Sequence, residues 1–210
     1  MTSAAGAVFA QNLLVNGSFE TETAANGNGR YQLTSTAAPN GWSFAPSAVT
    51  SDAIATTYYT AQDGTWSIQM GALGDPYSDS NPSQSSYDSL QQSVQTTAGG
   101  TYTLSYWLRD FDTAAGSFVF NATWNGAVIA GTQESLNIPN TWTEYTATVT
   151  GTGGMATLGL NGYDALAYGG LDNVSLVQSQ VAPSPSGLPI TVFTIGLGAA
   201  GFIALRRRSA

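Results

Sequence analysis

The chain contains no cysteine, no histidine and no lysine. Without cysteine it has no disulfide bond, no thiolate nucleophile and no cysteine-ligated zinc or iron–sulfur centre. Without histidine it lacks the commonest general base near neutral pH and the commonest transition-metal ligand. Serine–histidine–aspartate hydrolysis and zinc hydrolysis are therefore excluded as activities.

Charged residues are also scarce, at 9% of the 210 residues, against about 25% in typical soluble domains. Three of the five arginines are adjacent, at Arg206, Arg207 and Arg208. The rest of the chain sets two arginines against thirteen acids, a net charge near −11. Such an acidic surface repels phosphate backbones, which argues against a nucleic acid partner. It suits divalent cations and neutral ligands such as glycans.

The middle of the chain, residues 11–178, has the pattern of an all-β domain. Asn-Gly and Asp-Gly pairs recur along it, and such pairs tolerate the positive φ angles of tight turns. Between them lie short segments that alternate with period two, most clearly residues 101–109 and 118–124. No stretch before residue 188 has a sustained helical period. Many short strands with regular turns predict a β-sandwich or a barrel.

Both ends of the chain look like targeting segments rather than parts of the fold. Residues 1–10 are mostly small or apolar, and Val8 and Ala10 fit the small-residue positions of a signal-peptide cleavage site before Gln11. We interpret this stretch as a partial signal peptide; the alternative is a disordered N-terminus of small residues. Residues 179–187 form a linker that contains proline and serine.

Residues 188–205 are uncharged and mostly apolar. A helix of 18 residues is about 27 Å long, close to the thickness of a bilayer core. Arg206, Arg207 and Arg208 follow at once, so we expect the C-terminus on the cytoplasmic side and everything upstream outside. The alternative, a buried C-terminal helix of the domain, is disfavoured because the segment has no polar face.

This ending resembles the PEP-CTERM sorting signal of Gram-negative bacteria, which combines a Pro-Glu-Pro-Ser motif, an apolar helix and an arginine cluster. Pro183, Ser184 and Pro185 stand where the motif belongs, with Ser184 in place of the acidic residue. The resemblance implies processing by an exosortase-type enzyme, transient membrane anchoring through residues 188–210, and a location at the cell surface or in the extracellular matrix.

Several segments of the body resemble carbohydrate-binding-module-like jelly rolls with the galactose-binding-domain fold. The resemblance covers about residues 12–177 and implies an all-β jelly-roll β-sandwich, followed in this chain by the single C-terminal hydrophobic helix. In chain order the matching segments are residues 12–20 (NLLVNGSFE), Trp42, residues 66–70 (WSIQM), residues 90–107, residues 124–126 (WNG) and residues 171–176 (LDNVSL).

A structural Ca²⁺ site is the first candidate. Asp172 and Val174 are two residues apart, so in a regular strand both side chains point toward the buried face. An unpaired carboxylate is costly there. The resemblance places Glu20 beside Asp172, and Ca²⁺ accepts carboxylate and backbone carbonyl oxygens. We therefore expect Glu20 and Asp172 to bind Ca²⁺, with backbone carbonyls completing the shell. The alternative is a hydrated aspartate at a strand end.

A glycan-binding face is the second candidate. Trp107 and Arg109 lie two residues apart on the side of their strand that faces away from the core. Aromatic rings cover the apolar C–H faces of sugars, and planar polar groups bind paired hydroxyls, so this pair predicts contact with a polysaccharide. The alternative is that Trp107 packs beneath a loop or in the core of the second sheet.

Catalysis by paired carboxylates is the third candidate, because glycosidases use two of them. Asp110 with Asp112 and Glu134 with Glu144 can be paired in this way, but solvated surface acids explain them as well. The sequence thus predicts a non-enzymatic, exported surface module that binds polysaccharide. A structural matrix or biofilm protein with no specific ligand is the alternative.

Overall fold

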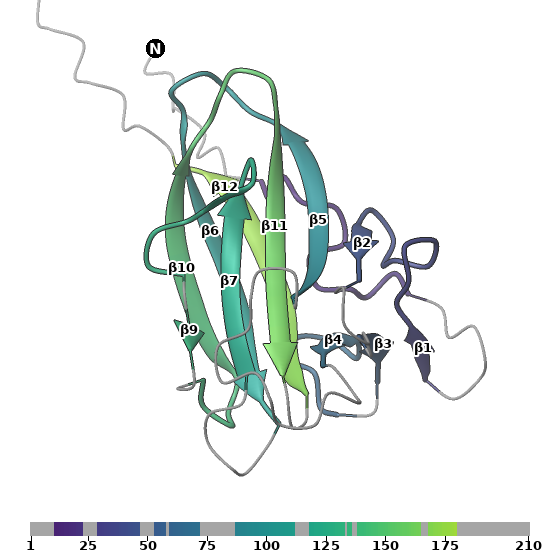
Figure 1. Ribbon diagram of the computed structural model, residues 1–210. Helices are drawn as coiled ribbons and strands as arrows, with labels where there is room; N and C mark the ends of the chain where they lie inside the picture. Colours follow the sequence, from purple (N-terminus) through teal and green to yellow (C-terminus); the bar gives the residue numbers. More distant parts are fainter. Residues whose placement is uncertain are drawn as a thin grey trace, which may run out of the picture. The chain divides into compact units, whose positions relative to one another are not determined.

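The computed structural model describes residues 11–22, 29–46, 53–57, 59–71, 87–111, 118–132, 134–135, 138–164 and 168–179 (Figure 1). The chain divides into two compact units, Met1–Gln180 and Val181–Ala210, and all described residues belong to the first. The predicted signal peptide, apolar helix and sorting residues, Pro183, Ser184, Pro185, Arg206, Arg207 and Arg208, lie outside the described residues.

Two antiparallel sheets make up the described part of the chain, as the turn-punctuated alternation predicts. It contains no helix, and so none long and apolar enough to cross a membrane. The first sheet has the order β1 (Arg30–Gln32), β3 (Ile54–Thr56), β4 (Ser67–Met70), β12 (Gly169–Gln178), β6 (Thr101–Asp110), β10 (Thr143–Thr150). The second has the order β2 (Ser43–Ala45), β5 (Asp88–Gln95), β11 (Met155–Asp164), β7 (Phe118–Trp124), β8 (Ala127–Val128), and β9 (Glu134–Ser135) also pairs with β7.

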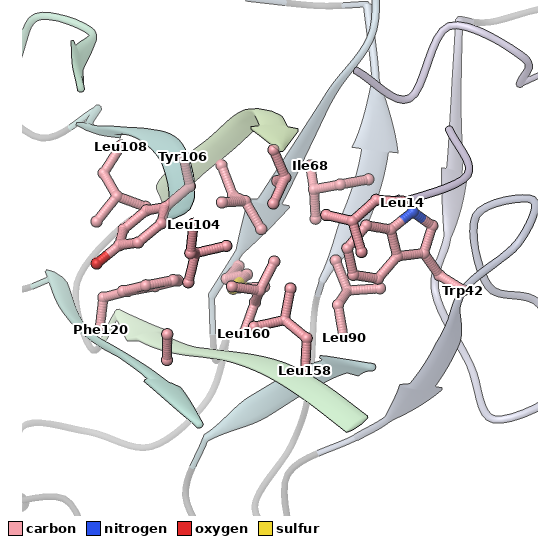
Figure 2. Close-up of a cluster of buried hydrophobic side chains, with 14 of the residues drawn as sticks. Leu14, Trp42, Ile68, Leu90, Leu104, Tyr106, Leu108, Phe120, Leu158 and Leu160 are labelled. Atoms are coloured by element: carbon pink, nitrogen blue, oxygen red, sulfur yellow. The ribbon is translucent and has the colours of Figure 1, made fainter. Parts of the chain in front are cut away.

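The core lies between the two sheets (Figure 2). Alternate residues of β6 are buried, as the sequence predicts, and Tyr106 packs against Phe120 of β7 with ring centroids 5.0 Å apart. Side chains of β4, β5 and β11 complete the same cluster, and Trp42 closes one end of it. The two sheets therefore form a β-sandwich. Each sheet has one face toward the core, and we call the opposite face its outer face.

The N-terminal segment runs beside the last strand. Leu13 N donates to Leu176 O at 2.8 Å, and Val174 N donates to Gly17 O at 2.8 Å. At Gly17 the chains approach so closely that a Cβ atom would overlap the carbonyl oxygen of Val174. The predicted adjacency of the first and last segments is confirmed. The opening segment, however, forms a single bridge at Asn12 rather than a strand.

A β-bulge in β12 changes the orientation of Asp172. Asp172 pairs with Trp107 of β6 and Ser175 pairs with Ser105, so three residues of β12 span two of β6. Asn173, inside the bulge, has a positive φ of 44°. The expectation that Asp172 faces the core because it shares parity with Val174 is therefore wrong. The bulge interrupts the alternation, and Asp172 lies on the outer face of the first sheet together with Trp107.

The contact at Gly17 gives a stability prediction. We expect Gly17→Ala to lower the free energy of unfolding by about 1–3 kcal/mol, because the added methyl group must push the N-terminal segment away from the backbone of β12. Gly154→Ala is the matched control, since a Cβ atom at Gly154 has nothing within 4 Å. Urea unfolding of both variants measures the difference, and equal midpoints would contradict the close packing.

Candidate functional site

A loop of residues 59–66, between β3 and β4, covers part of the outer face of the first sheet. Asp172 is fully buried beneath it, at 0% exposure. The Oδ2 atom of Asp172 accepts hydrogen bonds from Gln62 N at 2.7 Å and from Asp63 N at 3.1 Å, and Oδ1 accepts one from Asn173 N at 2.6 Å. The carboxylate thus binds both the loop and the bulge of its own strand.

The buried position of Asp172 favours its protonated form. Burial raises the pKa of the carboxyl group, the three backbone N–H groups oppose the rise and the charge of Glu20 adds to it, so that the pKa is about 7. A buried carboxylate with no cation near it is costly, and a proton or a bound cation would remove that cost.

Glu20 binds the other end of the same loop. Its Oε1 atom accepts hydrogen bonds from Thr65 N at 2.8 Å and from Trp66 N at 2.7 Å. Gly64 lies against the carboxylate with a φ of 64°, and a Cβ atom there would overlap it. The structure therefore brings the two predicted metal ligands, Glu20 and Asp172, to the same loop.

Glu20 and Asp172 offer the negative charge and the oxygen atoms that a hard cation binds, but they offer too few oxygen atoms to complete its shell. Ca²⁺ takes six to eight oxygen ligands, and three of the four carboxylate oxygens already accept backbone N–H groups. No group of three or more acidic residues in the described part of the chain is placed to hold a metal. Further ligands would have to come from backbone carbonyls or from solvent.

Beside the loop, Tyr59, Phe111 and Trp142 form a cluster that we call the aromatic patch. Phe111 stacks on Tyr59 with centroids 4.4 Å apart and planes at 23°, and it meets Trp142 edge-on at 5.9 Å. A Cβ atom on Gly170 would come within 2.7 Å of Phe111 and 2.8 Å of Trp142. The two rings therefore lie over β12 on the outer face, where a glycine leaves room for them.

The loop and the aromatic patch are physically connected. Tyr59 opens the loop and is 36% exposed, which makes it one of the few large exposed hydrophobic side chains. The indole Nε1 of Trp142 donates to Thr60 O at 2.9 Å. Because Glu20 and Asp172 hold the other residues of this loop, the two carboxylates help to fix the position of the aromatic patch.

The predicted glycan-binding residues lie on this same face. Arg109 lies beneath the aromatic patch, with its Cζ atom 4.9 Å from the centroid of Phe111 and its Nε atom buried without a hydrogen-bond partner. Trp107 pairs in register with Asp172 on one side and Glu144 on the other, and it is half-buried. Trp107 and Arg109 are therefore brought close to the loop, and neither is an open platform by itself.

The sequence did not single out the three residues of the aromatic patch. Phe111 continues the odd-numbered positions of Trp107 and Arg109, and this parity was a signal that could have found it. Tyr59 and Trp142 lie outside the strands, where alternation has no predictive value. Only the fold brings them together.

The outer face of the second sheet offers a different surface. Asn161 of β11 donates through Nδ2 to Asn121 Oδ1 of β7 at 2.9 Å, and both side chains are buried. Tyr163 and Val119 form a small buried cluster on this face. These polar groups already bind one another, so the aromatic patch is the stronger candidate for contact with a ligand.

The described side chains include only one member of each predicted acid pair, so the pairs stay a prediction. Asp110 is buried, whereas Glu144 is exposed on the edge strand β10. Asp112 and the side chain of Glu134 lie outside the described part of the structure.

Comparison with known proteins shows a shared fold. No protein family and no curated protein matches the sequence. A protein of Bacteroides thetaiotaomicron VPI-5482 with a proposed sugar-binding role matches in structure with a TM-score of 0.53 and 12% identity, over 80% of this chain and 100% of that one.

Two further structures are similar. The enzymatically active domain of tailspike protein 4 from bacteriophage CBA120 has a TM-score of 0.51 and 12% identity over 80% of this chain, which spans about a fifth (21%) of the phage chain. The carbohydrate-binding module TmCBM61, solved with beta-1,4-galactotriose, has a TM-score of 0.49 and 12% identity, over 80% of this chain and 99% of the module. At this identity the likeness establishes the fold, a two-sheet β-sandwich, and leaves function to the site.

The buried Asp172 predicts an unusual dependence of stability on pH. Its pKa is about 7 in the folded state and near 3.9 in an unfolded chain. Between about pH 4 and pH 7 the folded state therefore keeps a proton that the unfolded state has lost, so this group's contribution to stability falls as pH rises. We expect a loss of up to about 1.4 kcal/mol per pH unit in chelator-treated protein.

Urea unfolding between pH 4 and pH 8 measures this slope. Asp172→Asn should remove the contribution of Asp172 to this slope. Glu144→Gln, which changes an exposed carboxylate, should leave that contribution in place. A slope unchanged by Asp172→Asn would show that the carboxyl group titrates normally.

Proposed function

We propose that the domain is a non-catalytic module that binds polysaccharide through the aromatic patch, together with Trp107 and Arg109. One observation carries the proposal: Tyr59, Phe111 and the Arg109 guanidinium stack in sequence on a sheet face, with Tyr59 exposed at the end of the stack. Aromatic rings with a few fixed polar groups are the usual composition of small-ligand sites. The shared fold with a protein of proposed sugar-binding role supports the same conclusion.

Charge selects the class of sugar. The body of the chain carries two arginines and thirteen acids, and both arginines, Arg30 and Arg109, belong to the described domain. The field of such a surface repels polyanions at low ionic strength. A neutral polysaccharide therefore suits this module better than a strongly acidic one.

Export and anchoring complete the proposal and rest on the sequence alone. A partial signal peptide at residues 1–10 would direct secretion. Residues 188–210 would anchor the chain until an exosortase-type enzyme acts near Pro183, Ser184 and Pro185, and the domain would be displayed at the cell surface or in the matrix. Intact-mass analysis of protein recovered from the outer surface tests this, because it locates both processing points. A mass equal to the full chain would contradict it.

Substitution in the aromatic patch tests glycan binding. We expect Tyr59→Ala and Trp107→Ala each to weaken retention on neutral polysaccharide gels about tenfold, which corresponds to about 1.4 kcal/mol of binding free energy. Met155→Ala is the control, because Met155 is 62% exposed and lies on the other sheet.

Affinity electrophoresis on a panel of plant and bacterial polysaccharides gives the measurement. Retention of Tyr59→Ala and of Trp107→Ala equal to that of the unmodified protein would remove this site. No retention of any variant on any gel would favour the structural matrix protein with no specific ligand.

We also propose that Ca²⁺ stabilises the domain by binding Glu20 and Asp172. A cation bound only to the folded state must raise stability, and here it would also neutralise the buried charge beneath the loop. We expect millimolar Ca²⁺ to raise the melting temperature of the protein and a chelator to lower it. Asp172→Asn should abolish most of that difference. A melting temperature that the chelator does not move would count against a structural ion.

A further inference from the structure

The edge of the first sheet at β10 differs from the other sheet edges. Among the described strands β10 pairs only with β6, and it is 8 residues long. The strands at the other edges, β1, β2 and β8, have 3, 3 and 2 residues. Short edge strands are a common device against pairing with other chains, and β10 lacks this device.

The composition of β10 offers little other protection. Its sequence, TEYTATVT, contains no proline and no basic residue, and Glu144 is its one charged side chain. Its register with β6 is continuous from Thr143 to Thr150, so no bulge twists the edge away. Proline, charge and bulges are among the other devices that protect an edge.

Backbone hydrogen bonds identify which residues of β10 face the open edge. Ser179 N donates to Thr101 O at 2.8 Å, so Thr101 turns its backbone groups toward β12. Backbone groups alternate along an antiparallel strand, so Tyr102 turns toward β10. Its partner Val149 in turn faces back toward β6. Val149 and every second residue before it in β10 therefore direct their backbone N–H and C=O groups toward β6.

The residues between them direct their backbone groups outward. They are Glu144, Thr146, Thr148 and Thr150, and all four side chains are exposed. Thr150 O already accepts a hydrogen bond from the indole Nε1 of Trp124 at 3.0 Å. This leaves Glu144, Thr146 and Thr148 as three consecutive pairing positions on the edge.

We propose that two copies of this chain pair antiparallel through β10, with the two-fold axis at Thr146. In this register Thr146 faces Thr146 of the second copy, and Glu144 faces Thr148. The arrangement uses the three outward positions, forms one threonine–threonine pair at the axis, which favours sheet pairing, and keeps the two carboxylates from facing each other. The pairing is self-complementary, as a two-fold interface requires.

The pairing would also have a consequence for binding. The axis is perpendicular to the sheet, so the outer faces of the two first sheets lie on the same side. Taken with the proposed function, on which this step rests, both aromatic patches would be presented to one polysaccharide. Two linked sites bind a polymer more tightly than either site does alone.

Cysteine scanning tests the register directly, because the natural chain has no cysteine to interfere. The two Thr146 Cα atoms would lie about 5.5 Å apart, within the range that a disulfide spans. The two Thr148 Cα atoms would lie about 14 Å apart. We therefore expect Thr146→Cys in the full chain to form a disulfide-linked dimer under mild oxidation, whereas Thr148→Cys stays monomeric. Thr103→Cys, exposed on β6 opposite Thr148, is the control within the sheet.

Analytical ultracentrifugation of the cysteine-free protein gives the second readout. We expect a concentration-dependent dimer, and Thr146→Lys should raise its dissociation constant severalfold because two like charges then face each other. Thr103→Lys should leave it unchanged. Equal cross-linking at all three cysteine positions, or a monomer at every concentration, would overturn the proposal. A monomer whose Thr146 and Thr148 amides are protected from hydrogen exchange would show that a segment of the same chain covers the edge.

Discussion

The position of one buried carboxylate organises this domain. Asp172 is turned to the outer face of its sheet by the bulge at Asn173 and is then covered by the loop of residues 59–66. An ionised group in such a place requires hydrogen bonds or a counter-charge. Backbone N–H groups of the loop supply these hydrogen bonds, and the bonds tie the loop to β12.

The rest of the site follows from that loop. Gly17 lets the N-terminal segment approach β12 closely enough for Glu20 to bind Thr65 and Trp66, so the loop is held at two points. A loop fixed in this way places Tyr59 on Phe111. Preorganised aromatic surface loses little conformational freedom on binding, which is the physical advantage of the arrangement for a ligand as weakly held as a sugar.

Much of the fold could be predicted from the sequence, because alternation and turn residues are local signals. The alternating segments around Leu104, Phe120 and Leu158 predict the strands that carry the core. The local signal failed at Asp172, because a bulge depends on the pairing of two strands and is not visible in one of them. It also failed for Tyr59 and Trp142, which meet only after residues far apart in sequence are brought together.

The predictions for the site residues succeeded and failed for the same reasons. Trp107 and Arg109 were predicted to lie on one face because strand parity determines that much. The position of Arg109 beneath the ring of Phe111 was not predictable, because it depends on the place of that ring and on a glycine, Gly170, in a neighbouring strand. The pairing of Glu20 with Asp172 came from resemblance to a family and not from spacing.

We propose that polysaccharide binds the outer face of the first sheet, on the aromatic patch that the loop positions. Nuclear magnetic resonance of the protein titrated with a retained oligosaccharide tests this most directly. We expect the indole N–H signal of Trp142 and the ring signals of Tyr59 to shift first. Shifts confined to the side-chain amides of Asn121 and Asn161 on the second sheet would contradict it.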